Sequence, residues 1–347
     1  MKYRNVQISA LGYELAPVVV STSELEARLE PLYRALHVAP GQVQALTGIR
    51  ERRWWEPGYP LSRGALAAGE KALAVAGIAP DDIGVLVYTG VCREQFEPAT
   101  ACRVAAGLGV GGNAAIYDIS NACLGVLTGI LDVANRIELG QVRAGLVVSC
   151  ESAREINEIT IARMLARRDM EQFTSSLATL TGGSGAVAVL LTDGSFGHSG
   201  GHRLLGGAHL AAPEHHELCL WGVVPDGIGG AVQVMRTDAV KVMTHGVELG
   251  RRTWESFLPE MGWSADQVDR TICHQVGSAH QGAILTALGI PAEKDFTTYE
   301  FLGNMGSVSL PLTMALADER EVVMPGDRVA LLGIGSGLNC TMLGVEW

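Results

Sequence analysis

The sequence lacks the long apolar runs that a membrane protein needs. No run approaches the roughly 20 apolar residues that span a bilayer, and the first residues, MKYRNVQISALGYELAP, lack the long apolar core of a secretory signal peptide. The seven cysteines are an odd number without a C-x-x-C pair, which argues against a disulfide framework and a zinc site. We therefore expect a protein with reduced thiols in the cytoplasm.

Basic residues are also few. Lys and Arg number 26 against 37 Asp and Glu, a formal net charge of −11, which argues against a general binder of nucleic acid or of anionic membranes. A local basic stretch, GIRERRWW (48–55), is either the mouth for a phosphorylated ligand or a solvated turn, and the composition favours neither. With 48% hydrophobic and 18% charged residues, the chain is typical of a globular protein.

Metal-ligand spacing is absent as well. The glycine-rich stretch 195–222 contains His202, His209, His215 and His216, but these match no ligand spacing on a helix face. We expect surface histidines here and no metal.

What the chain does contain is an internal repeat. Within each half, helical segments alternate with short strands rich in Val, Ile and Leu, which is typical of a parallel sheet covered on both faces. We predict a duplicated α/β protein of five layers, α/β/α/β/α, in which a pseudo-twofold axis relates residues 1–194 to residues 195–347. Two stretches fall outside the repeat, a helical insert at 151–181 and the stretch 195–222. The matching segments, in the same order in both halves, are 80–91 with 265–276, 104–110 with 284–290, 117–127 with 299–309, and 140–152 with 326–337.

Three residues capable of acyl-transfer chemistry stand at predicted strand ends. Cys123 follows the strand AAIYDIS, His274 ends the strand DRTICHQV, and Asn304 follows the strand DFTTYEF, in the place that pairs with the Cys123 region of the other half. Functional groups of α/β sheets gather at the carboxyl ends of strands. We therefore expect these three side chains to meet where equivalent strand ends of the two halves come together.

Each residue type has a role in such chemistry. A helix N-terminus favours a thiolate at Cys123, which can take an acyl group from a thioester. The glycine-rich stretch GIGSGLNC (333–340) lets backbone N–H donors approach an oxyanion. His274 and Asn304 can donate hydrogen bonds to the oxygen of a second thioester and stabilise its enolate. Taken singly, Cys123 is typical of inert packing, His274 of a structural histidine and Asn304 of a turn. Their joint placement favours a catalytic site over a non-catalytic acyl-binding subunit.

Glu97 has two interpretations. The segment EQFEPATACRV is typical of a helix start with Pro98 in the first turn and acids near the N-terminus. This structural interpretation is sufficient by itself, so the residue pattern alone favours a helix-start acid over a catalyst.

The motifs TGIRERR, SNACLG, HQV, GNMGSVSLP and GIGSGLNC resemble those of the thiolase superfamily, and within it the β-ketoacyl-ACP synthase III type of condensing enzyme. The resemblance covers the whole chain and extends to the thiolases that condense acyl chains head to head in bacterial olefin biosynthesis. It implies an acyl-enzyme on Cys123, with His274 and Asn304 binding the second thioester. It also implies an oxyanion hole made by the backbone amides of Cys123 and Ser336.

The same resemblance implies that Glu97 is the base, which would reach into the partner subunit's site of a homodimer and deprotonate the second substrate. Departures from the elongating ketosynthases are visible. Ala279 stands where they have an arginine after the histidine motif, and Gln42 and Leu46 replace the tryptophan and arginine that clasp the CoA nucleotide.

We therefore predict a non-decarboxylative Claisen condensation of two acyl-CoA molecules, giving a β-keto acid or its thioester. The first alternative is a decarboxylative extension with a malonyl thioester. No cofactor is expected apart from the CoA of the substrate, and an acyl-ACP substrate stays open.

Overall fold

The computed structural model describes residues 1–197, 201–226 and 229–347. Its centre is a nine-stranded mixed sheet with the order β11-β12-β13-β8-β1-β7-β6-β4-β5. These strands are β1 (Gln7–Leu15), β4 (Val85–Thr89), β5 (Ala115–Ile119), β6 (Ala144–Glu151), β7 (Gly185–Thr192), β8 (His202–Ala211), β11 (Arg270–Cys273), β12 (Arg328–Gly335) and β13 (Asn339–Glu346). Two further pairs, β2 (Val18–Ser21) with β3 (Glu51–Trp54) and β9 (Cys219–Pro225) with β10 (Ala231–Thr237), lie outside it.

The two sections of the large sheet have the same strand order. In the first, β4 lies between β5 and β6, and β7 joins β6 to β1; in the second, β11 lies beside β12, and β13 joins β12 to β8. A parallel bridge between Thr271 and Asp295 occupies the edge that β5 fills in the first section. Strands β1 and β8 pair over only two residues, so the sections meet at a narrow seam. The bounds 1–194 and 195–347 for the two halves stay predictions.

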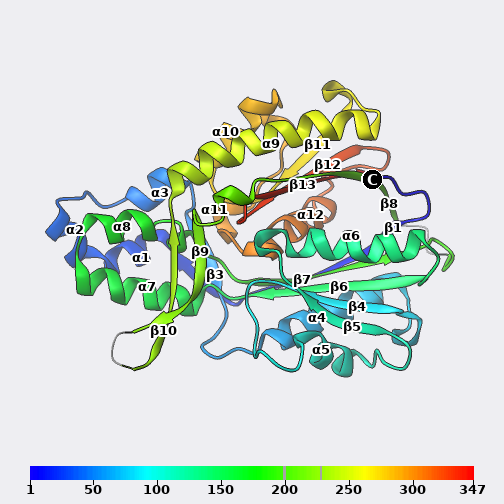
Figure 1. Ribbon diagram of the computed structural model, residues 1–347, viewed down its shortest axis with the longest axis horizontal. Coiled ribbons are helices and arrows are strands. Elements are labelled where there is room, and N and C mark those ends of the chain that lie inside the picture. The colour runs from blue at the N-terminus through cyan, green and yellow to red at the C-terminus, as the bar shows by residue number, and fades with distance from the viewer. Residues whose placement is uncertain (198–200, 227–228) are drawn as a thin grey trace.

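Helices form three layers around these sections, and the predicted five-layer α/β arrangement is confirmed (Figure 1). Helices α6 and α12 lie in the middle, α4 and α5 cover the first section, and α9 and α10 cover the second. The helices are α1 (Thr22–Arg28), α2 (Glu30–Leu36), α3 (Gln42–Thr47), α4 (Leu61–Ala76), α5 (Thr100–Leu108), α6 (Gly125–Glu138), α7 (Arg154–Arg167), α8 (Met170–Ser176), α9 (Ala239–Met261), α10 (Ser278–Leu288), α11 (Tyr299–Leu302) and α12 (Ser309–Glu319).

The middle layer is buried on both sides, and its sequence reflects this. Nine consecutive residues of α12, 309–317, are buried, and α6 buries the apolar positions that continue the same core cluster. All eight residues of β6 are buried as well, because helices cover both faces of that strand. The turns that carry the predicted nucleophile and the predicted asparagine lead directly into these two buried helices.

The predicted strand over DFTTYEF is wrong beyond its first residue. After the bridge at Asp295 the chain leaves the sheet and forms the short helix α11. The Gln275 side chain turns it, because its Oε1 accepts the N–H groups of Thr298 at 2.8 Å and Tyr299 at 3.1 Å. These amides are thus satisfied without a strand partner.

The stretch 195–222 does not fall outside the repeat, since it contains β8, the counterpart of β1. Its glycines, which hid the strand in the sequence, permit close approach of other backbone. A Cβ on Gly206 would lie 2.1 Å from the carbonyl oxygen of Met1, and one on Gly207 would lie 2.1 Å from that of Met342. Residues 198–200 of this stretch lie outside the described residues.

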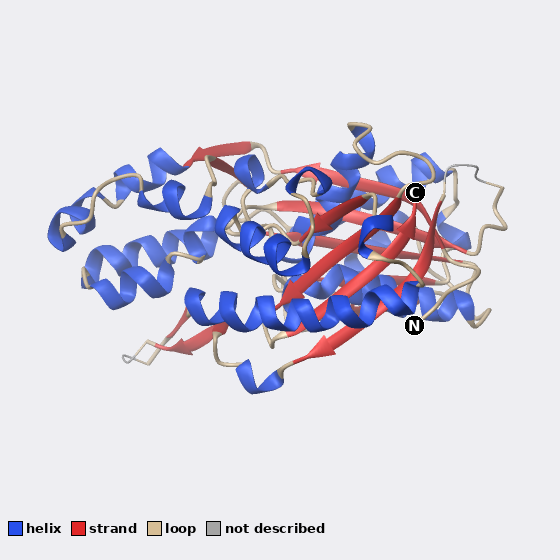
Figure 2. Cartoon of the chain, turned by 90° about the horizontal axis from the view of Figure 1, so that it is seen from above, coloured by secondary structure: helices blue, strands red, loops and turns tan. Residues whose placement is uncertain are grey.

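The insert at 151–181 is helical, as predicted. Helices α7 and α8 pack with α1, α2 and α3 around an apolar cluster that includes Leu29, Tyr33, Ile161 and Phe173. This group forms a lobe at one end of the sheet (Figures 1 and 2), and the β9–β10 hairpin contacts it through β10. Within the described ranges, no helix is long and apolar enough to cross a membrane.

Candidate active site

Cys123 lies in a tight turn between β5 and α6. It is the middle residue of the 3-10 helix η2 (Ala122–Leu124), and α6 begins two residues later, at Gly125. Ala122 has φ of 45°, a left-handed conformation that residues with a side chain rarely adopt. The Asn121 side chain braces the turn by donating to the Thr128 hydroxyl at 2.9 Å. Cys123 therefore lies ahead of the first residue of α6, in the turn that leads into the helix.

The end of β12 brings Cys123 and His274 to the same place. A Cβ on Gly335 would lie 3.4 Å from the Cys123 amide nitrogen, and one on Gly333 would collide with the side chains of Leu124 and Leu127. The absence of side chains lets β12 lie directly against η2. His274 follows the neighbouring strand β11 and donates its backbone N–H to the Leu332 carbonyl at 2.9 Å. Both predicted residues thus stand at the carboxyl end of β12.

Asn304 is held by its own amide oxygen. Its Oδ1 accepts the N–H of Gly306 at 3.0 Å and the hydroxyl of Ser309 at 3.4 Å. Backbone bonds to Thr181 and Gly183 fix the residue on the other side. Because Oδ1 is committed and Nδ2 has no partner among the described residues, the side chain is orientated as a hydrogen-bond donor.

The pairing of Asn304 with the Cys123 region is wrong in register. In the second half, the 3-10 helix η7 (Gly306–Val308) precedes α12 as η2 precedes α6, so Ser307 is the positional counterpart of Cys123. The two turns contact each other, and a Cβ on Gly125 would lie 3.3 Å from the Ser307 Cβ. Asn304 nevertheless enters the site, because it lies three residues before Ser307.

Ser336 lies between β12 and β13, directly after the glycine that touches the Cys123 amide. The backbone amides of Cys123 and Ser336 are thus neighbours across the η2–β12 contact. This is a suitable place for two donors to a single oxyanion.

Glu97 lies apart from these residues within one chain. Both Glu97 and the fully exposed Phe96 are in the loop between β4 and α5, and Glu97 has no hydrogen bond or ion pair with any described residue. The interpretation as a helix-start acid is wrong, because α5 begins at Thr100 and its first amides donate to the Asp118 carboxylate at 2.9 Å. Glu97 and its neighbours Phe96 and Pro98 are all exposed in the single chain.

Burial sets the resting protonation of the site. It raises the pKa of the Cys123 thiol to about 12, with smaller contributions from Cys219 and the carboxylate of Glu151. It also lowers the pKa of His274 to about 3, and His280 adds to this effect. Burial of Cys123 in the free chain therefore opposes the activation of the thiol that the helix terminus predicts. In the free chain, the Cys123 thiol and the His274 imidazole are therefore both neutral near pH 7.

This electrostatic state predicts the pH dependence of Cys123 alkylation. Since the thiolate reacts and the pKa is raised to about 12, the alkylation rate by iodoacetamide should rise about tenfold per pH unit through pH 9. Peptide mass spectrometry of the Cys123 peptide measures this rate, with the exposed Cys102 as an internal reference. A plateau of the Cys123 rate near pH 7 would contradict the account.

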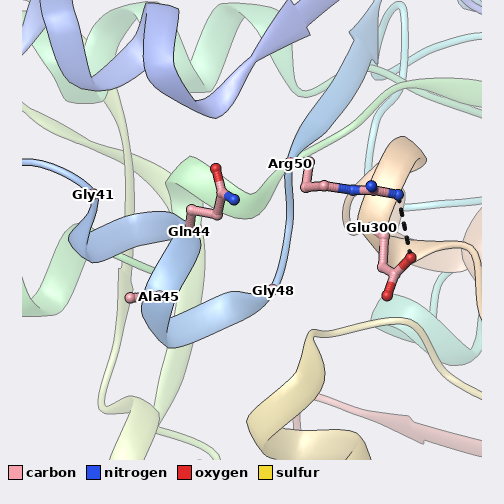
Figure 3. Close-up of a pocket in the computed structure, with 6 residues that line it drawn as sticks. All are labelled: Gly41, Gln44, Ala45, Gly48, Arg50 and Glu300. Atoms are coloured by element: carbon pink, nitrogen blue, oxygen red, sulfur yellow. Dashed lines mark hydrogen bonds and ion pairs between the residues drawn. The ribbon is translucent and has the colours of Figure 1, made fainter.

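A cavity of about 570 Å³ lies beside α3 and α11 (Figure 3). It is lined by Gly41, Gln44, Ala45, Gly48, Arg50 and Glu300. Arg50 and Glu300 point toward one another across it at 3.5 Å. Of the three arginines in the stretch 48–55, only Arg50 lines this cavity, since Arg52 is fully buried and Arg53 donates to the Ala16 carbonyl. The cavity adjoins α10, because a Cβ on Gly48 would lie 2.9 Å from the Ser278 hydroxyl.

The histidines of 195–222 have separate surroundings. His202 stacks on Trp347, His215 stacks on His245, and His209 lies 2.8 Å from the Thr341 hydroxyl. No group of three or more His, Cys, Asp or Glu side chains suited to a metal occurs in the described part of the chain.

Comparison with known proteins agrees with this geometry. The chain is 60% identical to the acyl-CoA:acyl-CoA alkyltransferase of Shewanella oneidensis over 349 residues, covering 100% of both. The chain belongs to this alkyltransferase family. The enzyme of the same description from Xanthomonas campestris is 34% identical over 100% of both chains. Residues 258–347 match the family of 3-oxoacyl-[acyl-carrier-protein] synthase III C-terminal regions.

Solved structures of the family have the same fold. A cysteine-to-serine variant of Xanthomonas campestris OleA, with bound lauric acid and lauroyl-CoA, superimposes with a TM-score of 0.93 at 33% identity, covering 99% of this chain and 100% of that one. The predicted thiolase fold, the likeness to ketosynthase III and the closeness to the OleA alkyltransferases are confirmed, as is the class of acyl-transferring condensing enzymes.

One residue of the site was not foreseen in the sequence. Glu151 ends the otherwise uncharged strand β6 and is only 4% exposed. A charged residue at the end of a fully buried strand was the signal that could have indicated it.

Proposed function

We propose that the protein joins two acyl-CoA molecules by a non-decarboxylative Claisen condensation, giving a β-ketoacyl thioester or the acid derived from it. Three observations support this proposal: the turn that carries Cys123 lies against the end of β12, His274 follows the neighbouring strand β11, and Asn304 is a fixed amide donor shortly before η7, which contacts the Cys123 turn. The names of the relatives and the lauroyl-CoA bound to OleA support acyl-CoA as the substrate.

In the first step, the sulfur of Cys123 attacks the thioester carbonyl of one acyl-CoA. The backbone amides of Cys123 and Ser336 hold the oxyanion. The C–S bond to CoA breaks, the thiol proton ends on the departing CoA sulfur, and the acyl group stays on Cys123.

In the second step, the thioester oxygen of another acyl-CoA accepts hydrogen bonds from His274 and Asn304. Glu97 of the partner subunit removes the α-proton, and the resulting enolate carbon attacks the acyl carbonyl on Cys123. The bond between this carbonyl and the Cys123 sulfur breaks, which frees the enzyme. A donor to the enolate cannot also accept the α-proton, so the base must be a separate group.

A homodimer supplies that base in this proposal. Strand β5 forms an open edge of the large sheet, and all five of its residues are partly exposed. Proteins seldom leave such an edge unprotected. The exposed Phe96 and Glu97 lie in the loop that follows the neighbouring strand β4, so a second copy on this edge would cover them.

The cavity beside α3 is the proposed entrance for CoA. Arg50 offers a cation to a phosphate there, and the glycine-lined wall leaves room for a bulky group. Leu46, at 53% exposed, leaves an apolar surface beside this wall. The seven unpaired cysteines fit a reducing compartment, and the cytoplasm is the location we propose.

Variants of His274 and Asn304 test this function. His274→Ala and Asn304→Asp should still acquire one acyl group on Cys123, because their donors serve the second substrate. Condensation should fall by about 10²-fold or more, as for the loss of one oxyanion donor. Asn304→Asp is the sharper variant, since it keeps the oxygen that accepts from Gly306 and replaces the Nδ2 donor by a carboxylate oxygen, which can only accept and repels an enolate.

Intact-mass analysis measures acylation, and the amount of β-keto product, resolved by mass spectrometry, measures condensation. Loss of acylation together with normal condensation in samples acylated beforehand would reverse the assigned roles.

A further inference from the structure

Glu151 accepts hydrogen bonds from two separate segments. Its Oε1 accepts the N–H of Val91 at 3.0 Å, and its Oε2 accepts the N–H of Cys92 at 3.0 Å. Its Oε1 also accepts the Ser307 hydroxyl at 2.7 Å. No Lys or Arg pairs with this carboxylate among the described residues, so oriented N–H and O–H donors stabilise the buried charge.

The two segments are the ones that carry the predicted base and the predicted enolate donor. Val91 and Cys92 begin the loop that leads to Glu97, and Ser307 lies in η7, three residues after Asn304. The Glu151 carboxylate thus connects the start of the loop that leads to Glu97 with the segment that contains Asn304 and Ser307.

The segments that Glu151 connects also contact the start of α6, directly after Cys123. A Cβ on Gly125, two residues after Cys123, would lie 3.2 Å from the Gly90 amide nitrogen and 3.3 Å from the Ser307 Cβ. Gly90 and Gly306 both approach the carboxylate, since a Cβ on either would lie 3.2 Å from its Oε1. The elements that carry Cys123, Glu97 and Asn304 therefore meet around one side chain.

We propose that Glu151 is a positioning residue that sets the Glu97 loop and the Asn304 segment in register with Cys123 for the condensation step. The proposal rests on the proposed function above. It differs from a purely structural role, because it assigns the effect to the second step and not to acylation or to the fold.

The chemistry requires a carboxylate at this position. The hydrogen bonds that the Glu151 carboxylate accepts from Val91, Cys92 and Ser307 use both of its oxygens. A glutamine would present an NH₂ group to at least one donor, which leaves that N–H or O–H unsatisfied. One of the two segments must then move.

The test compares Glu151→Gln with wild type in three measurements on the full-length protein. Acylation of Cys123 by lauroyl-CoA should stay within about twofold of wild type. Condensation should fall by about 10²-fold, the lower bound for loss of a general base. Amide exchange in the peptide that contains Val91 and Cys92 should accelerate by about tenfold or more. Condensation within twofold of wild type, unchanged exchange, or an equal loss of acylation would each overturn the proposal.

Two further variants decide the question if Glu151→Gln does not fold. Ser307→Ala removes the hydrogen bond between the Ser307 hydroxyl and Glu151 but not those from Val91 and Cys92. Condensation should therefore fall by about tenfold while amide exchange at Val91 and Cys92 stays unchanged. Glu151→Asp keeps the charge but retracts it, so condensation should fall while exchange of the loop rises. Normal condensation in both variants would overturn the proposal.

Glu138→Gln is the matched control. Glu138 also accepts two consecutive backbone amides, those of Arg4 and Asn5, but at the far end of α6. It should leave acylation and condensation within about twofold of wild type, and a loss equal to that of Glu151→Gln would overturn the proposal. If wild type itself releases no condensed product, the proposed function fails. Faster amide exchange at Val91 and Cys92 with retained acylation in Glu151→Gln would still show that Glu151 positions the loop, so the two failures are distinguishable.

Discussion

Cys123→Ala is expected to abolish both the acyl adduct and the condensed product. The turn that displays this thiol at the end of β12 has no second nucleophile in the same position, so no covalent intermediate can form. Condensation should fall by at least about 10⁴-fold, in the range found when an enzyme loses its nucleophile. Intact-mass analysis after treatment with acyl-CoA should show one adduct in wild type and none in the variant.

Cys219→Ala is the informative control for this experiment. Cys219 is the other thiol whose charge affects the pKa of Cys123, so it is the most plausible alternative acceptor. The Cys219→Ala variant should keep the adduct. An adduct that persists in Cys123→Ala and disappears in Cys219→Ala would identify Cys219, on strand β9, as the nucleophile.

Glu97→Gln is expected to leave acylation intact and to reduce condensation by about 10²–10⁴-fold, the usual contribution of a general base. A malonyl thioester generates its own carbanion equivalent when it loses carbon dioxide, whereas a plain acyl thioester must lose an α-proton to a base. Single-turnover condensation by protein acylated beforehand isolates this step. Full activity of Glu97→Gln would favour the decarboxylative alternative.

Mixed dimers test whether the base crosses the interface. A dimer of one Glu97→Gln subunit and one Cys123→Ala subunit contains a single site with Cys123, and the Cys123→Ala subunit faces it with an intact Glu97. Activity should return in this dimer although neither homodimer is active. No recovery in a verified mixed dimer would exclude action in trans.

The sequence predicted the fold where its periodicity reflects burial. Strand β6 and the helices α6 and α12 lie between layers, and their apolar runs indicate this directly. Strand β8 was missed because Gly206 and Gly207 serve backbone contacts that the chain makes only after folding. The strand expected after Asp295 was wrong because the side chain of Gln275, some twenty residues earlier, takes the amides that a strand would have paired.

The sequence offers candidate residues for the site but not their electrostatics. Cys123 and His274 follow strand ends, whereas Asn304 follows the short helix α11, and the motifs around the three residues carry the information that groups them. The raised pKa of Cys123 depends on burial by residues distant in sequence, and the helix dipole alone pointed in the opposite direction. Glu97 was assigned to a helix start because the sequence does not show that Asp118, on a different strand, already satisfies the first amides of α5.

Product analysis with a single acyl-CoA tests the central proposal most directly. Lauroyl-CoA carrying two deuterium atoms at its α-carbon is incubated with the protein alone, and the products are resolved by mass spectrometry. The account predicts a β-keto product that contains two lauroyl chains, has lost one of the four deuterium atoms, and forms with release of CoA and without malonyl-CoA. A product that appears only when malonyl-CoA is added, lengthened by two carbons and accompanied by carbon dioxide, would contradict it.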